Sequence, residues 1–239
     1  MKHVPIPILI AGLLALAGCA HNVEYAGHSA PPASQTRESQ SAATPATALA
    51  ALKAGNARFV SGQSLHRDFL AQVKQTSTGQ FPFASIVSCM DSRTSSELVF
   101  DQGLGDIFNV RVAGNIVNSD ILGSLEYGSK VAGSKLIAVV GHTKCGAVGG
   151  ACDNVKLGNL TGLVQQIRPA VEQTPPANGE HTSGHDYTYV NRVAETNVRL
   201  TLQAIRERSP VLRELIDSGK VGLVGGIYDV TTGTVHFLD

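Results

Sequence analysis

Short runs of apolar residues that alternate with helical patterns are the feature of this sequence that most limits its fold. Four such runs occur, at residues 83–88, 107–111, 136–140 and 221–227. Patterns with the apolar spacing of a helix face flank and separate them, at residues 47–60, 65–76, 121–131, 147–156, 160–171 and 190–208. Buried strands that alternate with helices are typical of a mostly parallel sheet with helices packed on it. The sequence therefore predicts an α/β fold with a mostly parallel central sheet flanked by helices.

The end of the chain predicts one exception to the parallel order. Thr231-Thr-Gly-Thr234 is a turn signal, because Gly and Thr favour tight reversals of the backbone. The turn should fold residues 234–238 back onto the preceding strand. We therefore expect an antiparallel edge strand near the C-terminus.

Two of the predicted strands run directly into side chains that bind metals. Cys89 follows the run at 83–88, and His142 and Cys145 follow the run at 136–140. In open α/β sheets functional residues collect beyond the carboxyl ends of the strands, so the three side chains should lie at one edge. Two thiolates and one imidazole provide three ligands, a catalytic zinc keeps a fourth position open, and thiolates favour zinc over magnesium or calcium. The sequence therefore predicts one Zn²⁺ per chain.

A redox interpretation of the same cysteines stays open. Thiols in an exported protein tend to oxidise, and a disulfide between Cys89 and Cys145 needs no metal. That interpretation gives no role to His142, nor to Asp91 and Arg93, which follow Cys89 closely. Metal analysis of the purified protein separates the two interpretations.

The first residues predict export and a lipid anchor. Residues 6–17 form an apolar run that is too short to span a bilayer as a mature helix. The run ends in Leu16-Ala17-Gly18-Cys19, which resembles the lipobox of bacterial lipoprotein signal peptides and implies acylation of Cys19. Ala20 follows the cysteine, and this favours the periplasmic side of the outer membrane if the organism is Gram-negative.

The predicted organisation therefore has three parts. A lipoprotein signal peptide occupies residues 1–18, and a lipid-anchored flexible tether occupies 19–45, where Ser, Ala, Thr, Pro and Gln dominate without apolar periodicity. The folded catalytic domain occupies residues 46–239. The chain carries 19 basic and 19 acidic residues, so no net positive charge supports nucleic-acid binding.

Two motifs in this order resemble the β-class carbonic anhydrases. They are Cys-x-Asp-Ser-Arg at 89–93 and Gly-His-x-x-Cys-Gly-Ala at 141–147. Four further stretches are similar to the family: Gly55-Asn-Ala-Arg-Phe59, Phe100-Asp-Gln-Gly103, Arg111-Val-Ala-Gly-Asn115 and Glu126-Tyr127. The resemblance covers about residues 46–239. It implies reversible hydration of carbon dioxide to bicarbonate and a proton by attack of zinc-bound hydroxide, in a homodimer or higher homo-oligomer whose site lies at the subunit interface.

The resemblance also implies roles at the metal. Cys89, His142 and Cys145 are the zinc ligands. Asp91 binds the zinc as a fourth ligand in a closed state, or pairs with Arg93 in an open state that leaves the metal accessible. Because a guanidinium grips a carboxylate with two hydrogen bonds, Arg93 is interpreted as the residue that keeps Asp91 off the metal.

Four substrate-binding positions follow from the same resemblance. Phe108 and Tyr127 are expected to form an apolar wall, although ordinary core aromatics are nearly as good an interpretation of these two residues alone. Gln80 matches a glutamine that donates to a substrate oxygen across the dimer interface. The backbone N–H of Gly146 matches a second donor.

Two other functions stay open at this point. The same ligands can serve a hydrolase of carbon disulfide or carbonyl sulfide. A non-catalytic, lipid-anchored zinc-binding protein is the other alternative, but a structural zinc site has no use for Asp91, Arg93 and Gln80.

Overall fold

The computed structural model describes residues 32–239, and the predicted signal peptide and Cys19 lie outside these residues. A five-stranded sheet with the order β2-β1-β3-β4-β5 forms the centre of the described domain. Its strands are β1 (Ala84–Ser88), β2 (Ile107–Arg111), β3 (Leu136–His142), β4 (Gly222–Tyr228) and β5 (Val235–Phe237). The pairs β1–β2, β1–β3 and β3–β4 are parallel, and β5 is antiparallel to β4. The predicted fold class and the antiparallel edge strand are confirmed.

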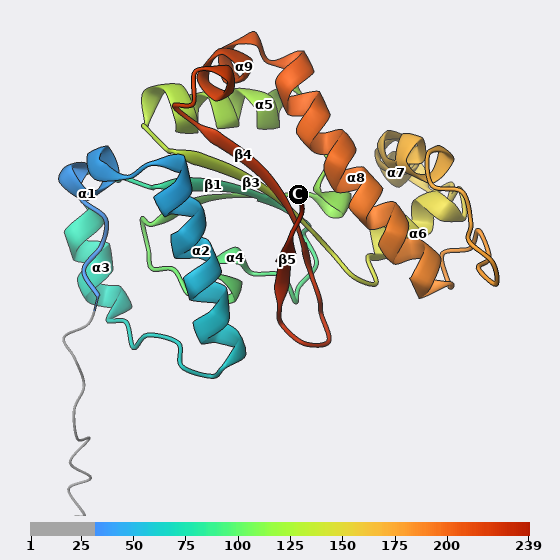
Figure 1. Cartoon of the computed structure of the whole chain (residues 1–239), viewed down its shortest axis with the longest axis horizontal. Helices are drawn as coiled ribbons and strands as arrows, with labels where there is room; N and C mark the ends of the chain where they lie inside the picture. Colours follow the sequence, from blue (N-terminus) through green and yellow to red (C-terminus); the bar gives the residue numbers. More distant parts are fainter. Residues whose placement is uncertain (1–31) are drawn as a thin grey trace, which may run out of the picture. The chain divides into compact units, whose positions relative to one another are not determined.

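The helices surround this sheet and agree with most of the predicted helical segments (Figure 1). They are α1 (Arg37–Ala42), α2 (Pro45–Val60), α3 (Phe69–Thr76), α4 (Ser96–Val99), α5 (Ser119–Glu126), α6 (Gly146–Cys152), α7 (Gly158–Glu172), α8 (Tyr187–Arg208) and α9 (Pro210–Asp217). A 3₁₀ turn, η1 (Ala113–Asn115), follows β2, and a π turn, η2 (Tyr127–Val131), extends α5. The sequence did not predict α1, α4 or α9, which are short. Within residues 32–239, no helix combines the length and apolarity that crossing a bilayer requires.

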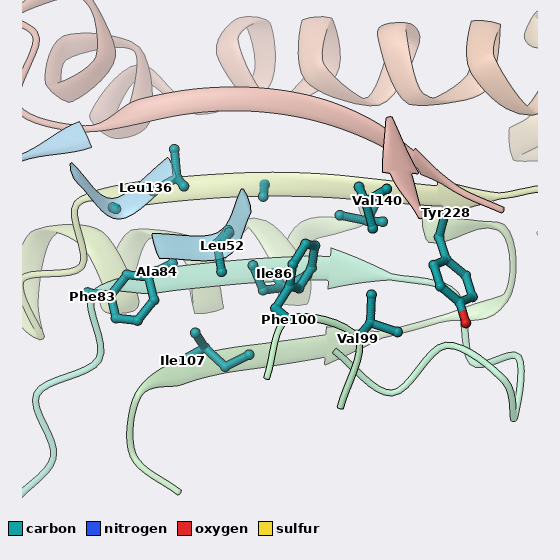
Figure 2. Packing of buried hydrophobic residues seen from close by; sticks show 13 residues of the cluster. Leu52, Phe83, Ala84, Ile86, Val99, Phe100, Ile107, Leu136, Val140 and Tyr228 are labelled. Atoms are coloured by element: carbon teal, nitrogen blue, oxygen red, sulfur yellow. The ribbon is translucent and has the colours of Figure 1, made fainter. Parts of the chain in front are cut away.

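Alternate side chains of the strands face two different helical layers. Ala84 and Ile86 of β1 pack with Leu52 of α2 and with Phe100, as Figure 2 shows. Val87 of the same strand packs in a second cluster with residues of α5, α8 and α9. Both faces of the sheet are therefore covered, which is why the central strands β3 and β4 are almost uniformly apolar.

The predicted tether differs from the structure in its second half. Residues 37–42 form α1, whose N-cap Thr36 and Ser39 make a reciprocal capping box. Gln40 is buried, and its amide donates to the carbonyls of Pro82 and Ala132 at 2.8 Å each. The folded domain therefore begins before residue 46. Composition alone missed this segment because polar contacts such as those of Gln40, rather than an apolar stripe, attach it.

Two of the family-like stretches pack against each other. Gly55 of α2 lies so close to Phe100 that a Cβ atom at Gly55 would be 1.8 Å from the Phe100 carbonyl oxygen. The next residue, Asn56, donates to the carbonyls of Val99 and Gly233 at 3.0 and 2.9 Å. A residue without a side chain is thus needed at position 55, and the two stretches have a structural reason to occur together.

The substitution Gly55→Ala tests this close approach. The added methyl group meets backbone rather than a flexible side chain, so we expect the free energy of unfolding to fall by about 2–3 kcal/mol. Gly162→Ala is the matched control, since Gly162 also lies in a helix but has open space around it. That control should leave stability unchanged or raise it by up to about 1 kcal/mol. Chemical denaturation measures both, and equal effects of the two substitutions would contradict the assignment.

Candidate metal centre

The three predicted metal ligands meet at one edge of the sheet. β1 and β3 are adjacent and parallel, with Ser88 opposite Val140, so the residues that follow each strand emerge side by side. The ligand atoms of Cys89, His142 and Cys145 all lie within 4.8 Å of one another, and all three residues are buried. The prediction that the ends of two strands bring these side chains together is confirmed.

The orientation of the His142 ring fits a metal. Its Nδ1 atom lies 2.9 Å from the backbone carbonyl oxygen of Thr143, which only accepts, so Nδ1 carries the proton. The lone pair of Nε2 is then free, and this buried atom has no hydrogen-bond partner. A buried nitrogen without a partner is costly unless something else binds it. Two soft thiols beside it make zinc the cation that the donor set fits.

The pKa values of Cys89 and Cys145 are shifted in opposite directions. The Cys145 thiol hydrogen-bonds to Cys89 and, with a smaller contribution from the Gly114 N–H, lowers the pKa of Cys89 to about 4 despite its burial. Interaction with the Cys89 thiolate, followed by burial, raises the pKa of Cys145. Ionisation of one thiol therefore opposes ionisation of the other, and a nearby positive ion would favour two thiolates. Cys89, Cys145 and Cys152 are all free thiols, so the structure does not contain the alternative Cys89–Cys145 disulfide.

Asp91 is paired with Arg93 beside the ligands. Arg93 donates from Nε to Asp91 Oδ1 and from Nη2 to Asp91 Oδ2, both at 2.8 Å. These hydrogen bonds hold the pKa of Asp91 well below its usual range. Asp91 Oδ2 is still only 3.9 Å from His142 Nε2. The carboxylate thus lies next to the ligand cluster while both of its oxygens are occupied by Arg93.

Arg111 and Thr94 shape the segment that carries Cys89 and Asp91. Arg111, the last residue of β2, donates from Nε to the Cys89 carbonyl at 3.1 Å and from Nη2 to the Asp91 carbonyl at 2.6 Å. The Thr94 hydroxyl lies 3.0 and 2.9 Å from the same two carbonyls. Neither residue was predicted from the sequence to have a role. The only signal for Arg111 was its place in a stretch that resembles the family.

Helix α8 contacts both halves of the ligand set. Asn191 Oδ1 accepts the N–H of Lys144, in the turn between His142 and Cys145, at 2.7 Å. Asn197 Nδ2 donates to the carbonyl of Gly114 at 2.8 Å, and the Gly114 N–H donates to Cys89 Sγ at 3.4 Å. Neither asparagine was predicted from the sequence to contact the site.

Only one of the four predicted substrate residues lies beside the ligands of its own chain. Gly146 directly follows Cys145 and begins α6. Phe108 pairs with Ser85, near the start of β1, and Cys89 follows the end of that strand, about 13 Å further along at the usual rise per residue. The Tyr127 ring lies 6.3 Å from the Phe108 ring and is half exposed. Gln80 is exposed and precedes β1. Phe108 and Tyr127 therefore do not lie beside the metal ligands of their own chain, and their place in the wall of a substrate site stays a prediction.

Comparisons with known proteins agree on one family. The family model described as carbonic anhydrase matches residues 84–235. Carbonic anhydrase 2 of Mycobacterium tuberculosis is 37% identical over 198 residues, which cover 82% of this chain and 93% of the relative. A solved β-carbonic anhydrase of Aspergillus fumigatus superposes with a TM-score of 0.64 at 27% identity, over 81% of this chain and 90% of that one. A tetrameric β-carbonic anhydrase of Sordaria macrospora has the same fold, with a TM-score of 0.60 at 24% identity over 81% and 97% of the two chains.

Proposed function

The chain belongs to the β-class carbonic anhydrase family, and we propose that Cys89, His142 and Cys145 hold the zinc at which it hydrates carbon dioxide reversibly. The products are bicarbonate and a proton. The observation that carries this assignment is the buried, unpartnered Nε2 of His142, which lies within 4.8 Å of two thiol sulfurs. When bound, zinc supplies the Lewis acidity that lets water act as a nucleophile near neutral pH.

We assign Asp91 and Arg93 the control of access to the metal. Arg93 binds both Asp91 oxygens, so this carboxylate would not block a zinc held by Cys89, His142 and Cys145. Asp91 stays ionised and remains an acceptor for the O–H of the attacking water, so it orients the water lone pair toward the carbon of carbon dioxide. The low pKa of this carboxylate makes it an orienting group rather than a store for the released proton.

Arg93→Ala separates metal binding from catalysis. The three zinc ligands remain, so zinc content should stay near one per chain. Asp91 is released 3.9 Å from His142 Nε2 and can take the fourth position, so we expect kcat/KM to fall about 100-fold. Stopped-flow carbon dioxide hydration with metal analysis of the same sample measures both. The wild-type protein in the same assay tests the proposed reaction itself, and a zinc-loaded wild type without activity would overturn it.

Arg93→Lys is the control for charge alone. A lysine keeps the positive charge but cannot bind both carboxylate oxygens in a fork. The activity of Arg93→Lys should therefore lie between that of the wild type and that of Arg93→Ala. Full activity in Arg93→Ala, or loss of its zinc, would contradict the assigned role.

We propose that a second copy of the chain completes the substrate site. Gln80, Phe108 and Tyr127 lie toward the start of the parallel strands, whereas the metal ligands lie at their end. In the described domain β2 is an edge strand, paired with β1 alone. If two copies pair along β2 about a two-fold axis, their β2 strands run antiparallel. The N-terminal ends of the strands in one copy then lie beside the C-terminal ends of the strands in the other. Gln80 would then donate to a substrate oxygen, and Phe108 and Tyr127 would form the apolar wall, in the partner's site.

Mixed dimers test this arrangement. Gln80→Ala and His142→Ala chains should each be nearly inactive alone, but a mixed dimer has one site with an intact metal centre and an intact glutamine. Statistical mixing should restore about a quarter of the wild-type sites. A mixture of Arg93→Ala with His142→Ala is the control, since both residues serve the metal of their own chain, and it should restore nothing. Failure of the first mixture to exceed its parents would show that Gln80 does not act across the interface.

We also propose that the protein is exported and anchored to a bacterial membrane through a lipid on Cys19. The Leu16-Ala17-Gly18-Cys19 sequence after a short apolar run supports this. Ala20 directly after the cysteine supports the periplasmic side of the outer membrane if the organism is Gram-negative.

Replacement of the acylated cysteine tests the anchor. Cys19→Ala should lose incorporation of labelled fatty acid and move the protein from the membrane fraction to the soluble fraction. Cys152→Ala is the matched control, because this buried cysteine lies within the folded domain, and it should keep both properties. Membrane association and labelling that persist in Cys19→Ala would disprove the anchor.

A further inference from the structure

The core-facing side of α8 carries two polar residues where apolar ones are expected. Its buried positions include Val190, Val193 and Ala194, followed on the same face by Asn197 and Thr201, which are only 3% and 5% exposed. Buried polar side chains are retained where they make hydrogen bonds. Both residues contact the η1 turn beside the metal ligands. Helix α8 therefore contacts the η1 turn beside the metal ligands as well as covering the sheet.

Asn197 holds the residue that donates to a ligand sulfur. A carbonyl oxygen can only accept, so the amide nitrogen of Asn197 must face the Gly114 carbonyl, 2.8 Å away. Gly114 has a φ of 71°, and a Cβ atom there would be 2.4 Å from Cδ1 of Ile167. Its N–H is directed at Cys89 Sγ at 3.4 Å. One residue in a left-handed conformation is thus fixed through its carbonyl by Asn197 and presents its N–H to the thiolate.

We propose that Asn197 is a positioning residue that sets the donor strength of the Cys89 thiolate toward zinc, an inference that rests on the proposed function. A hydrogen bond to a ligand sulfur draws charge from it, so the sulfur donates less to the metal and the metal keeps more of its Lewis acidity. The carbonyl and the N–H of Gly114 belong to different peptide groups. Asn197 therefore acts by holding the turn in place, not by polarising one shared peptide.

Thr201 provides a matched control on the same helix face. Its hydroxyl lies 3.5 Å from the carbonyl oxygen of Asn115, the residue after Gly114. It contacts the same turn and is equally buried, but it does not bond Gly114. Thr201→Val thus removes a polar contact between α8 and η1 and leaves the Gly114 to Cys89 contact in place.

Loading the full-length chain with Co²⁺ gives a spectroscopic measure of how strongly the Cys89 sulfur donates to the metal. Asn197→Leu keeps most of the side-chain volume but removes the donor. In the Co²⁺-loaded Asn197→Leu variant, the sulfur-to-cobalt charge-transfer band should lie at lower energy than in the Co²⁺-loaded wild type, because the Cys89 thiolate donates more strongly to the metal. In the zinc protein the Kd measured against a competing chelator should change by about tenfold. Thr201→Val should leave the band and the Kd at their wild-type values, even if it lowers the thermal stability by the same amount.

Two results would overturn the inference. One is an unchanged band in Asn197→Leu, and the other is an equal shift in Thr201→Val. If Asn197→Leu does not fold, Asn197→Ala takes its place. The wild-type protein loaded with ¹¹³Cd gives an independent reading, since scalar coupling between the Gly114 amide proton and the metal requires the N–H···S contact, and its absence also overturns the inference. A wild type that binds no cobalt or cadmium would instead refute the metal site itself.

Discussion

The parallel pairing of β1 with β3 is the constraint on which the rest of the site depends. In-register parallel strands end at the same edge, so Cys89 leaves the sheet beside the end of β3, which carries His142. Both strands are buried on both faces, which fixes their spacing to that of a packed core. The ligand positions therefore inherit the rigidity of the sheet. Ligands on a flexible loop would instead lose conformational entropy when the metal binds.

The same burial makes the site costly without a cation. The unpartnered His142 Nε2 leaves an acceptor desolvated, which costs about 1–3 kcal/mol. Ionisation of one of the neighbouring thiols also opposes ionisation of the other, as the opposite shifts in the pKa values of Cys89 and Cys145 indicate. A divalent ion resolves both problems at once, because it accepts the imidazole lone pair and balances two thiolates. We therefore expect metal binding to raise the free energy of unfolding of this domain.

Contacts around the ligands come from several parts of the chain. Arg93 binds the Asp91 carboxylate, and Arg111 donates to the backbone of the same segment. Helix α8 forms hydrogen bonds with the turns next to Cys89 and Cys145. Such contacts orient ligands that are already close together. The residues assigned to substrate lie elsewhere, along the first part of β1 and β2. One chain thus brings the three candidate metal ligands together but leaves the proposed wall residues far from them, which is the basis of the proposed shared site.

The sequence by itself determined the sheet, its antiparallel edge strand and the three ligands, because apolar runs, a turn signal and the residues that follow strands are local features that survive tertiary packing. It also contained the pair of Asp91 and Arg93, two positions apart. Only the tertiary structure decided what depends on long-range contacts. It placed Phe108 at the far end of the strand from Cys89, and it attached α1 to the domain through Gln40. It also directed Asn197, 83 residues away in sequence, at the Gly114 carbonyl. A polar residue on the apolar stripe of a helix was the only local sign of that contact, and its partner could not be identified until the chain had folded around the metal ligands.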